Sequence, residues 1–176
     1  LFFTERPGRI LVLEPGKPPR LLATIEVAAQ REGGLLGLAL SPAFAQDRYI
    51  YIYHTYRDAA GLKNRVVRFT EQGDRGTSPT TIIDNIPGAG IHDGGRLRFG
   101  PDGKLYVTAG DASQSELAQN PRSLAGKILR INPDGSIPAD NPAPGSPVFS
   151  RGHRNPQGLD WHPSTGKLYE VEHGPT

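Results

Sequence analysis

The feature that most constrains the fold is an internal repeat of about 60 residues. In each copy, a short stretch of alternating apolar and polar residues runs into a Pro-containing turn and a second alternating stretch (residues 37–53, 96–108 and 158–171). The turn prolines, Pro42, Pro101 and Pro163, are 59 and 62 residues apart. Alternation with a period of two predicts β-strands, and two such strands joined by a turn predict a hairpin. The repeat therefore predicts an all-β chain built from similar units.

A second strand-like element repeats in phase with the first. Residues 9–13, 65–69 and 127–131 each run into a Gly-bearing turn, and their starts are 56 and 62 residues apart. Two interleaved elements with one period indicate antiparallel sheets of several strands, stacked face to face around an axis as in a β-propeller. A two-sheet sandwich is the alternative, but it gives no reason for such a period.

Three periods are too few to close a ring, because propellers close with about four to eight blades. We therefore interpret residues 1–176 as one partial propeller domain of about three four-stranded blades, the N-terminal half of a six-bladed β-propeller. We expect the remaining half of the propeller, or a second copy of the chain, to cover the sheet edges and faces that would otherwise be exposed.

Composition excludes several classes of protein. Only 36% of the 176 residues are hydrophobic and no apolar run reaches about 20 residues, so we expect no membrane span. The 20 Lys and Arg and the 18 Asp and Glu are scattered, which leaves no electrostatic footprint for nucleic acid. The absence of Cys excludes disulfides, thiolate metal sites and cysteine nucleophiles. The first residues are not a signal peptide, and we expect a periplasmic or secreted protein whose export signal has been removed.

Four Gly-rich loops between the predicted strands carry polar residues suited to a functional site. Binding and catalytic residues commonly lie on loops held by a rigid scaffold. Taken singly each loop is weak evidence, because a Gly-rich turn is usually only a turn and a lone His in a loop is more often solvated than catalytic. The loops comprise residues 32–37, 91–96, 110–111 and 152–158.

In their order and spacing these loops resemble the soluble sugar dehydrogenases that depend on pyrroloquinoline quinone (PQQ), the family of glucose and aldose sugar dehydrogenases. The resemblance covers nearly the whole chain but about half of a family member. It implies PQQ and Ca²⁺ as cofactors, an aldose as small-molecule substrate, and an external electron acceptor. The matching runs are Gly-Leu-Leu-Gly (34–37), Gly-Pro-Asp (100–102), Gly-Asp (110–111), Gly-Lys-Ile-Leu-Arg-Ile-Asn (126–132), His-Arg-Asn-Pro-Gln-Gly (153–158) and Glu-His-Gly-Pro (172–175).

The resemblance implies catalytic roles for His92, Asp111 and Arg154. Oxidising the anomeric carbon of an aldose to a lactone requires a base for the hydroxyl proton, and imidazole suits that role near neutral pH. His92 matches the base of the family, and Asp111 matches the carboxylate that would fix the imidazole tautomer. Arg154 matches the arginine beside the quinone and the sugar oxygen. From the residues alone, the alternatives are that Asp111 is a turn-forming residue and that Arg154 is a surface arginine.

Cofactor and metal contacts are implied in the same way. Arg154 and Asn155 match cofactor contacts, while Gln157 either contacts the cofactor or only braces the loop. The backbone carbonyls of Gly174 and Pro175 match those that bind Ca²⁺, a hard cation that prefers oxygen ligands.

Two residues near the expected sugar site depart from the glucose-oxidising members. Glu32 stands where those members have Gln, and Ile91 stands where they have an Asp that binds glucose. We expect both residues to contact substrate. Because a site that lacks a hydroxyl-binding carboxylate discriminates less between sugars, the resemblance favours the aldose sugar dehydrogenase branch and a broad substrate range.

Two other functions are compatible with a propeller. A non-catalytic propeller would use its blades as a binding platform for a protein or glycan, and a lactonase-type hydrolase would need a metal cage of Asp, Asn and Glu side chains. A binding platform has no need to keep His92, Asp111 and Arg154 together on different loops. We therefore expect an oxidoreductase.

Overall fold

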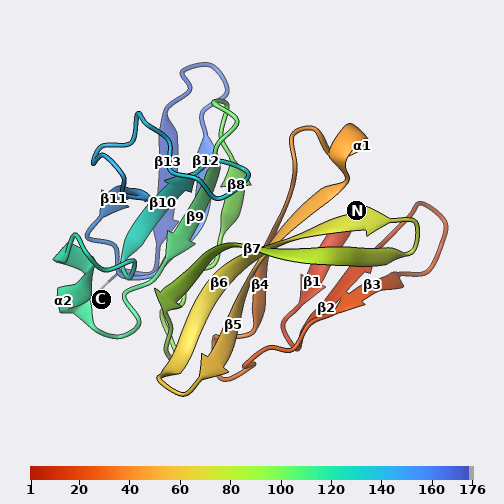
Figure 1. The fold of residues 1–176 in the computed structure, drawn as a ribbon, viewed down its shortest axis with the longest axis horizontal. Helices are drawn as coiled ribbons and strands as arrows, with labels where there is room; N and C mark the ends of the chain where they lie inside the picture. The colour runs from red at the N-terminus through yellow and green to blue at the C-terminus, as the bar shows by residue number, and fades with distance from the viewer. Residues whose placement is uncertain (175–176) are drawn as a thin grey trace.

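The computed structural model describes residues 1–174, which form four antiparallel β-sheets in succession along the chain (Figure 1). The first sheet contains β1 (Phe2–Glu5), β2 (Arg9–Val12) and β3 (Arg20–Thr24). The second contains β4 (Leu35–Leu40), β5 (Tyr49–Asp58), β6 (Gly61–Gln72) and β7 (Arg75–Pro87). The third contains β8 (Leu97–Phe99), β9 (Leu105–Ala109), β10 (Lys127–Ile131) and β11 (Val148–Arg151), and the fourth β12 (Pro156–Trp161) and β13 (Leu168–Glu172). Two short helices, α1 (Phe44–Asp47) and α2 (Ser115–Gln119), lie in the connections.

The predicted hairpins occur where the repeat places them. They are the antiparallel pairs β4–β5, β8–β9 and β12–β13. The second repeated element coincides with β2, β6 and β10, and in the two four-stranded sheets it is the third strand. The all-β prediction is confirmed, and each sheet follows the strand order of a propeller blade.

The sheets pack face to face, and β5 shows how the sequence brings this about. Ile50 and Ile52 pack against the first sheet in one apolar cluster, whereas Tyr51 and Tyr53 pack toward the third sheet in another. All four side chains are fully buried. Because successive residues of a strand point to opposite faces, an uninterrupted apolar run indicates a strand covered on both sides. The second sheet therefore lies between the first and the third sheets.

The third and fourth sheets pack in the same way. Tyr106 of β9, Ile128 of β10 and Leu159 of β12 form a further buried cluster. The ring of Tyr106 meets the ring of Trp161 edge to face, with 4.9 Å between their centroids. This successive stacking places the loops that precede β4, β8 and β12 side by side, and these loops carry the candidate site.

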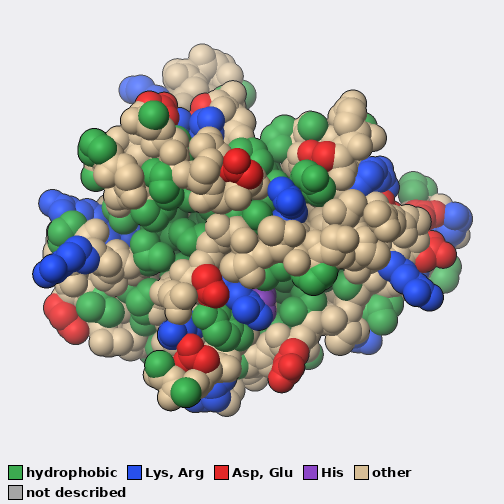
Figure 2. Space-filling model, viewed as in Figure 1, with side chains coloured by type: hydrophobic (Ala, Val, Ile, Leu, Met, Phe, Trp, Pro, Cys, Tyr) green, Lys and Arg blue, Asp and Glu red, His purple; other side chains and the backbone are tan. Residues whose placement is uncertain are grey.

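Charged side chains of both signs are interspersed over the face shown in Figure 2. Neither sign gathers into a stripe there, in keeping with the near balance of 20 basic and 18 acidic residues. Within residues 1–174, neither helix has the length and apolar character needed to cross a bilayer.

Acid should destabilise the protein partly through His54, which is buried in β5. Arg65 Nε donates a hydrogen bond to His54 Nε2 at 3.0 Å. Burial, together with the nearby Arg65 charge, lowers the pKa of His54 to about 4. The unfolded chain then binds more protons between pH 6.5 and pH 4, so the stabilisation is complete above pH 6.5 and is lost as the pH falls through 4.

We expect the wild-type protein to lose on the order of 2 kcal/mol more stability than His54→Gln between about pH 7 and pH 4.5. The glutamine side chain retains an acceptor for Arg65 but does not titrate. Denaturant unfolding of the cofactor-free protein at the two pH values measures the difference. Parallel losses in the two proteins would contradict this account of His54.

Candidate active site

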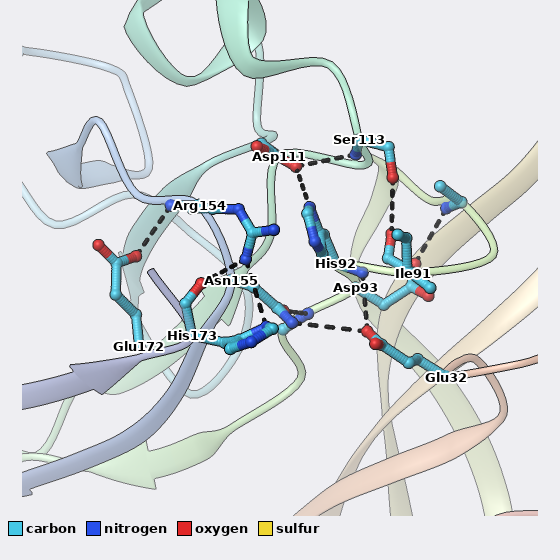
Figure 3. A network of polar contacts seen from close by, with 12 residues as sticks. Glu32, Ile91, His92, Asp93, Asp111, Ser113, Arg154, Asn155, Glu172 and His173 are labelled. Atoms are coloured by element: carbon cyan, nitrogen blue, oxygen red, sulfur yellow. Dashed lines mark hydrogen bonds and ion pairs between the residues drawn. The ribbon is translucent and has the colours of Figure 1, made fainter. Parts of the chain in front are cut away.

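Four loops that are distant in the sequence converge on one region of the molecule (Figure 3). They are the segments before β4 (25–34), before β8 (88–96), after β9 (110–114) and before β12 (152–155), together with the end of β13. All the described residues predicted for the site lie here or directly beside it.

His92 and Asp111 form the centre of the site. His92 Nδ1 lies 2.8 Å from Asp111 Oδ1, and both residues are buried. The same carboxylate oxygen accepts a hydrogen bond from the Ser113 amide at 2.8 Å, while the Asp111 amide donates to the Arg154 carbonyl at 2.8 Å. A carboxylate only accepts hydrogen bonds, so this contact places a proton on Nδ1 and leaves Nε2 as the basic nitrogen of a neutral imidazole.

The backbone around His92 is held in an unusual conformation. His92 has φ 63°, in the left-handed region that few residues with a Cβ adopt. Its amide donates to Glu32 Oε2 at 2.8 Å, and its carbonyl accepts from the Ala112 amide at 3.2 Å. A Cβ at Gly110 would lie 1.9 Å from that carbonyl oxygen, so glycine is required there for the two loops to approach.

Asp93 anchors the same loop to the second sheet. Its Oδ1 accepts hydrogen bonds from Asn64 Nδ2 at 2.9 Å and the Ala89 amide at 3.1 Å, and its carbonyl accepts from the Tyr53 hydroxyl at 2.8 Å. Burial raises the pKa of the Asp93 carboxyl. Sequence reasoning did not single out this residue, although its place directly after His92 was a usable signal.

Arg154 is tied to the loop that follows β13. Its amide donates to Glu172 Oε2 at 2.8 Å, and its Nη1 donates to the His173 carbonyl at 2.8 Å. Nη1 also lies 3.2 Å from His173 Nδ1 and 3.4 Å from the Gly174 carbonyl. The ring of His173 stands edge to face with that of His92, 6.5 Å apart by centroids. The fold thus places a guanidinium, a second imidazole and the Gly174 carbonyl beside the His92–Asp111 pair.

Asn155 and Gln157 connect this loop to the loop before β8. Asn155 Oδ1 accepts hydrogen bonds from the Gly94 amide at 3.1 Å and from Gln157 Nε2 at 2.9 Å. Asn155 Nδ2 lies 3.5 Å from Glu32 Oε2. These contacts favour the bracing role for Gln157. A cofactor contact by Asn155 stays a prediction.

A cavity of about 610 Å³ opens beside these loops. Its volume is within the range of small-molecule and cofactor sites. Glu32, Asn155 and Gln157 line it, whereas Ile91, His92, Asp111 and Arg154 are not among its lining residues. Ile91 is half-buried, and its carbonyl accepts a hydrogen bond from Ser113 Oγ at 3.4 Å.

Three arginines in the cavity wall were not predicted from the sequence. Arg6, Arg31 and Arg96 come from separate loops and join His173 in the lining. They form no run or motif, so their convergence is visible only in the fold. Two carboxylates, those of Glu32 and Asp93, line the same cavity, so its wall carries charges of both signs with the arginines in excess.

The oxygen donors predicted for Ca²⁺ are only partly described. The Gly174 carbonyl accepts a long hydrogen bond from Arg154, which leaves a lone pair for a hard cation. Pro175 lies outside the described residues.

A second group of potential metal ligands lies next to Arg154. Ligand atoms of His153, Glu170 and Glu172 are within 4.8 Å of one another. Burial lowers the pKa of His153, and burial with the nearby Glu172 charge raises the pKa of Glu170. Glu172 already accepts from the Arg154 amide, so we interpret this cluster as a polar brace of the loop.

Comparisons with known proteins identify the family of the chain. The family described as Glucose / Sorbosone dehydrogenase matches residues 1–176. A structure from Thermus thermophilus, described as a putative oxidoreductase (glucose dehydrogenase), is 48% identical to this chain with a TM-score of 0.93. The match covers 99% of this chain and 54% of the Thermus chain. The PQQ-bound aldose sugar dehydrogenase from Streptomyces coelicolor is 39% identical with a TM-score of 0.89, and the match covers 99% of this chain and 53% of the Streptomyces chain.

A curated relative extends the comparison to a further organism. Quinoprotein glucose dehydrogenase B of Acinetobacter calcoaceticus is 34% identical over 99% of this chain and 44% of its own length. The chain thus spans about half the length of the relatives it matches. The resemblance inferred from the loops is confirmed over the whole sequence, and the chain belongs to the glucose / sorbosone dehydrogenase family.

Proposed function

We propose that the full-length protein is a PQQ- and Ca²⁺-dependent oxidoreductase that oxidises aldoses at the anomeric carbon to lactones and passes the electrons to an external acceptor. The observation that carries this proposal is the buried His92–Asp111 pair, 2.8 Å apart, beside a cavity of about 610 Å³. The named activities of the relatives support an oxidoreductase.

The residues of the chain divide the chemistry between them. His92 Nε2 accepts the proton of the anomeric hydroxyl, and the Asp111 carboxylate stabilises the imidazolium that results. Arg154 supplies a fixed positive charge where negative charge develops on the acceptor. When bound, PQQ supplies the two-electron acceptor for the hydride released from the anomeric carbon, and Ca²⁺ supplies polarisation of that acceptor. Loss of this proton and hydride converts the C–OH group to the lactone carbonyl.

The arginines of the cavity wall are residues of this chain that could pair with an anionic cofactor. PQQ carries carboxylates, and Arg6, Arg31 and Arg96 would provide cations to hold them. Asn155 adds an amide to the same wall, and the Gly174 carbonyl would be an oxygen ligand of Ca²⁺.

The substrate range and the cellular location are further parts of the proposal. Ile91 offers no hydroxyl-binding group directly before the base, so we expect several mono- and disaccharide aldoses to be oxidised with comparable efficiency. Electron transfer to an external acceptor and the activities of the relatives are compatible with a periplasmic or secreted enzyme.

Titration of the full-length, cofactor-free protein with PQQ tests the proposal directly. With Ca²⁺ present we expect the absorbance spectrum of the quinone to change on binding, and addition of an aldose should then reduce an artificial electron acceptor. A chelator should weaken both signals. An unperturbed PQQ spectrum with and without Ca²⁺ would overturn the proposal and favour a non-catalytic binding platform.

A further inference from the structure

We propose that Glu32 is a positioning residue and not primarily a substrate contact. It holds the base loop, residues 88–96 with the proposed base His92, in its productive conformation. The catalytic consequence rests on the proposed function, whereas the structural role does not. Glu32 belongs to the segment before β4, and His92 lies 60 residues later in the loop before β8.

Glu32 contacts the loop of His92 at two points, and Figure 3 shows the contact made by its side chain. The Glu32 amide donates to the Gly90 carbonyl at 3.0 Å, and Glu32 Oε2 accepts from the His92 amide at 2.8 Å. The two contacts lie on either side of Ile91, so they fix the backbone conformation directly before and at His92. A backbone contact and a side-chain contact from one residue define both the position and the orientation of a loop.

The conformation of His92 requires such support. Its φ of 63° is unfavourable for a residue with a Cβ, and it persists only where surrounding contacts hold it. The His92 amide is partly buried, and Glu32 Oε2 is its acceptor. A carboxylate is a strong acceptor for an amide. Without the Glu32 carboxylate the His92 amide would lose this acceptor, so we expect the backbone at His92 to relax and the imidazole to be held less closely against Asp111.

Glu32 also joins a third loop to this arrangement. Asn155 Nδ2 approaches Glu32 Oε2 at 3.5 Å, and Asn155 Oδ1 accepts from the Gly94 amide at 3.1 Å. The base loop is thereby held by Glu32 at residue 92 and by Asn155 at residue 94. One carboxylate oxygen contacts two of the three loops that supply His92, Asp111 and Arg154, which is the geometry expected of a positioning residue.

The test compares three variants of the full-length protein. Glu32→Ala removes the acceptor, and Glu32→Asp keeps the charge on a side chain too short to reach the His92 amide. Glu32→Gln keeps an acceptor oxygen without the charge. Glu26→Ala is the matched control, because Glu26 is an exposed residue of the same segment. Hydrogen–deuterium exchange of the peptide covering residues 88–96 is measured on the cofactor-free protein. Steady-state kinetics are measured with PQQ and Ca²⁺.

We expect Glu32→Ala and Glu32→Asp to accelerate exchange in residues 88–96 and to lower kcat by about 10-fold with little change in KM, as loss of a hydrogen bond to a charged group implies. Glu32→Gln, which keeps an acceptor oxygen, should show slower exchange in residues 88–96 and a smaller loss of kcat than Glu32→Asp. Glu26→Ala should match wild type in both measurements. If Glu32→Ala does not fold, the contrast between Asp and Gln carries the test.

Unchanged exchange in Glu32→Asp would overturn the proposal. A raised KM with unchanged kcat would also overturn it and would assign Glu32 to substrate binding. The exchange measurement remains decisive even if the protein oxidises no aldose, so failure of the proposed function is distinguishable from failure of this inference.

Discussion

Replacing His92 with Asn in the full-length protein should lower kcat for aldose oxidation by at least about 10²-fold, the usual effect of losing a general base. The asparagine side chain cannot accept a proton near neutral pH, but it can donate a hydrogen bond toward Asp111 and preserve the loop. Affinity for PQQ should therefore change little. Steady-state kinetics at saturating PQQ and Ca²⁺, combined with a cofactor titration, separate the two effects.

His162→Asn is the matched control for this change. His162 is an exposed residue in the turn between β12 and β13, outside the cavity, and its replacement should leave kcat unchanged. Near-native turnover of His92→Asn would show that another group removes the proton. The next variant would then be His173→Asn, because the His173 ring lies 6.5 Å from that of His92.

Replacing Asp111 with Ala should lower kcat by about 10- to 100-fold, since the imidazolium formed at His92 loses a hydrogen bond to a charged partner. Asp111→Asn should have a smaller effect. Its amide oxygen can still accept from His92 Nδ1 and from the Ser113 amide, as Oδ1 does in the native site, so only the negative charge is lost. Steady-state kinetics of both variants separate the contribution of orientation from that of charge.

Asp134→Ala controls for the turn-forming role of Asp111. Asp134 Oδ1 accepts from the amide of Ser136 at 3.0 Å, the same contact with the residue two positions on that Asp111 makes to Ser113. Asp134 has no imidazole partner in the described structure. We expect its loss to affect stability at most and to leave kcat unchanged. Equal effects of the two Ala variants on kcat would mean that Asp111 is only a turn residue.

The architecture was predictable because its signals are local and repeated. A strand buried on both faces requires an unbroken apolar run, as in β5, and a hairpin requires a turn between two such runs. These patterns recur at one period, so the sequence alone determined the strands, the hairpins and the stacking of sheets. The His-Arg-Asn-Pro-Gln-Gly run likewise indicated the loop of Arg154, through its resemblance to the family.

The arrangement of the site depended on contacts that no local pattern encodes. Asp111 lies 19 residues from His92, Glu32 lies 60 residues from it, and Asn155 lies 123 residues from Glu32. The resemblance predicts that Glu32 contacts substrate, and the tertiary structure adds a contact that no local pattern indicates, the hydrogen bond from the His92 amide to this carboxylate. Period and composition determined which strands form and stack. The tertiary structure decided which loop atoms meet, because loop conformation depends on the sheets that hold both ends of each loop.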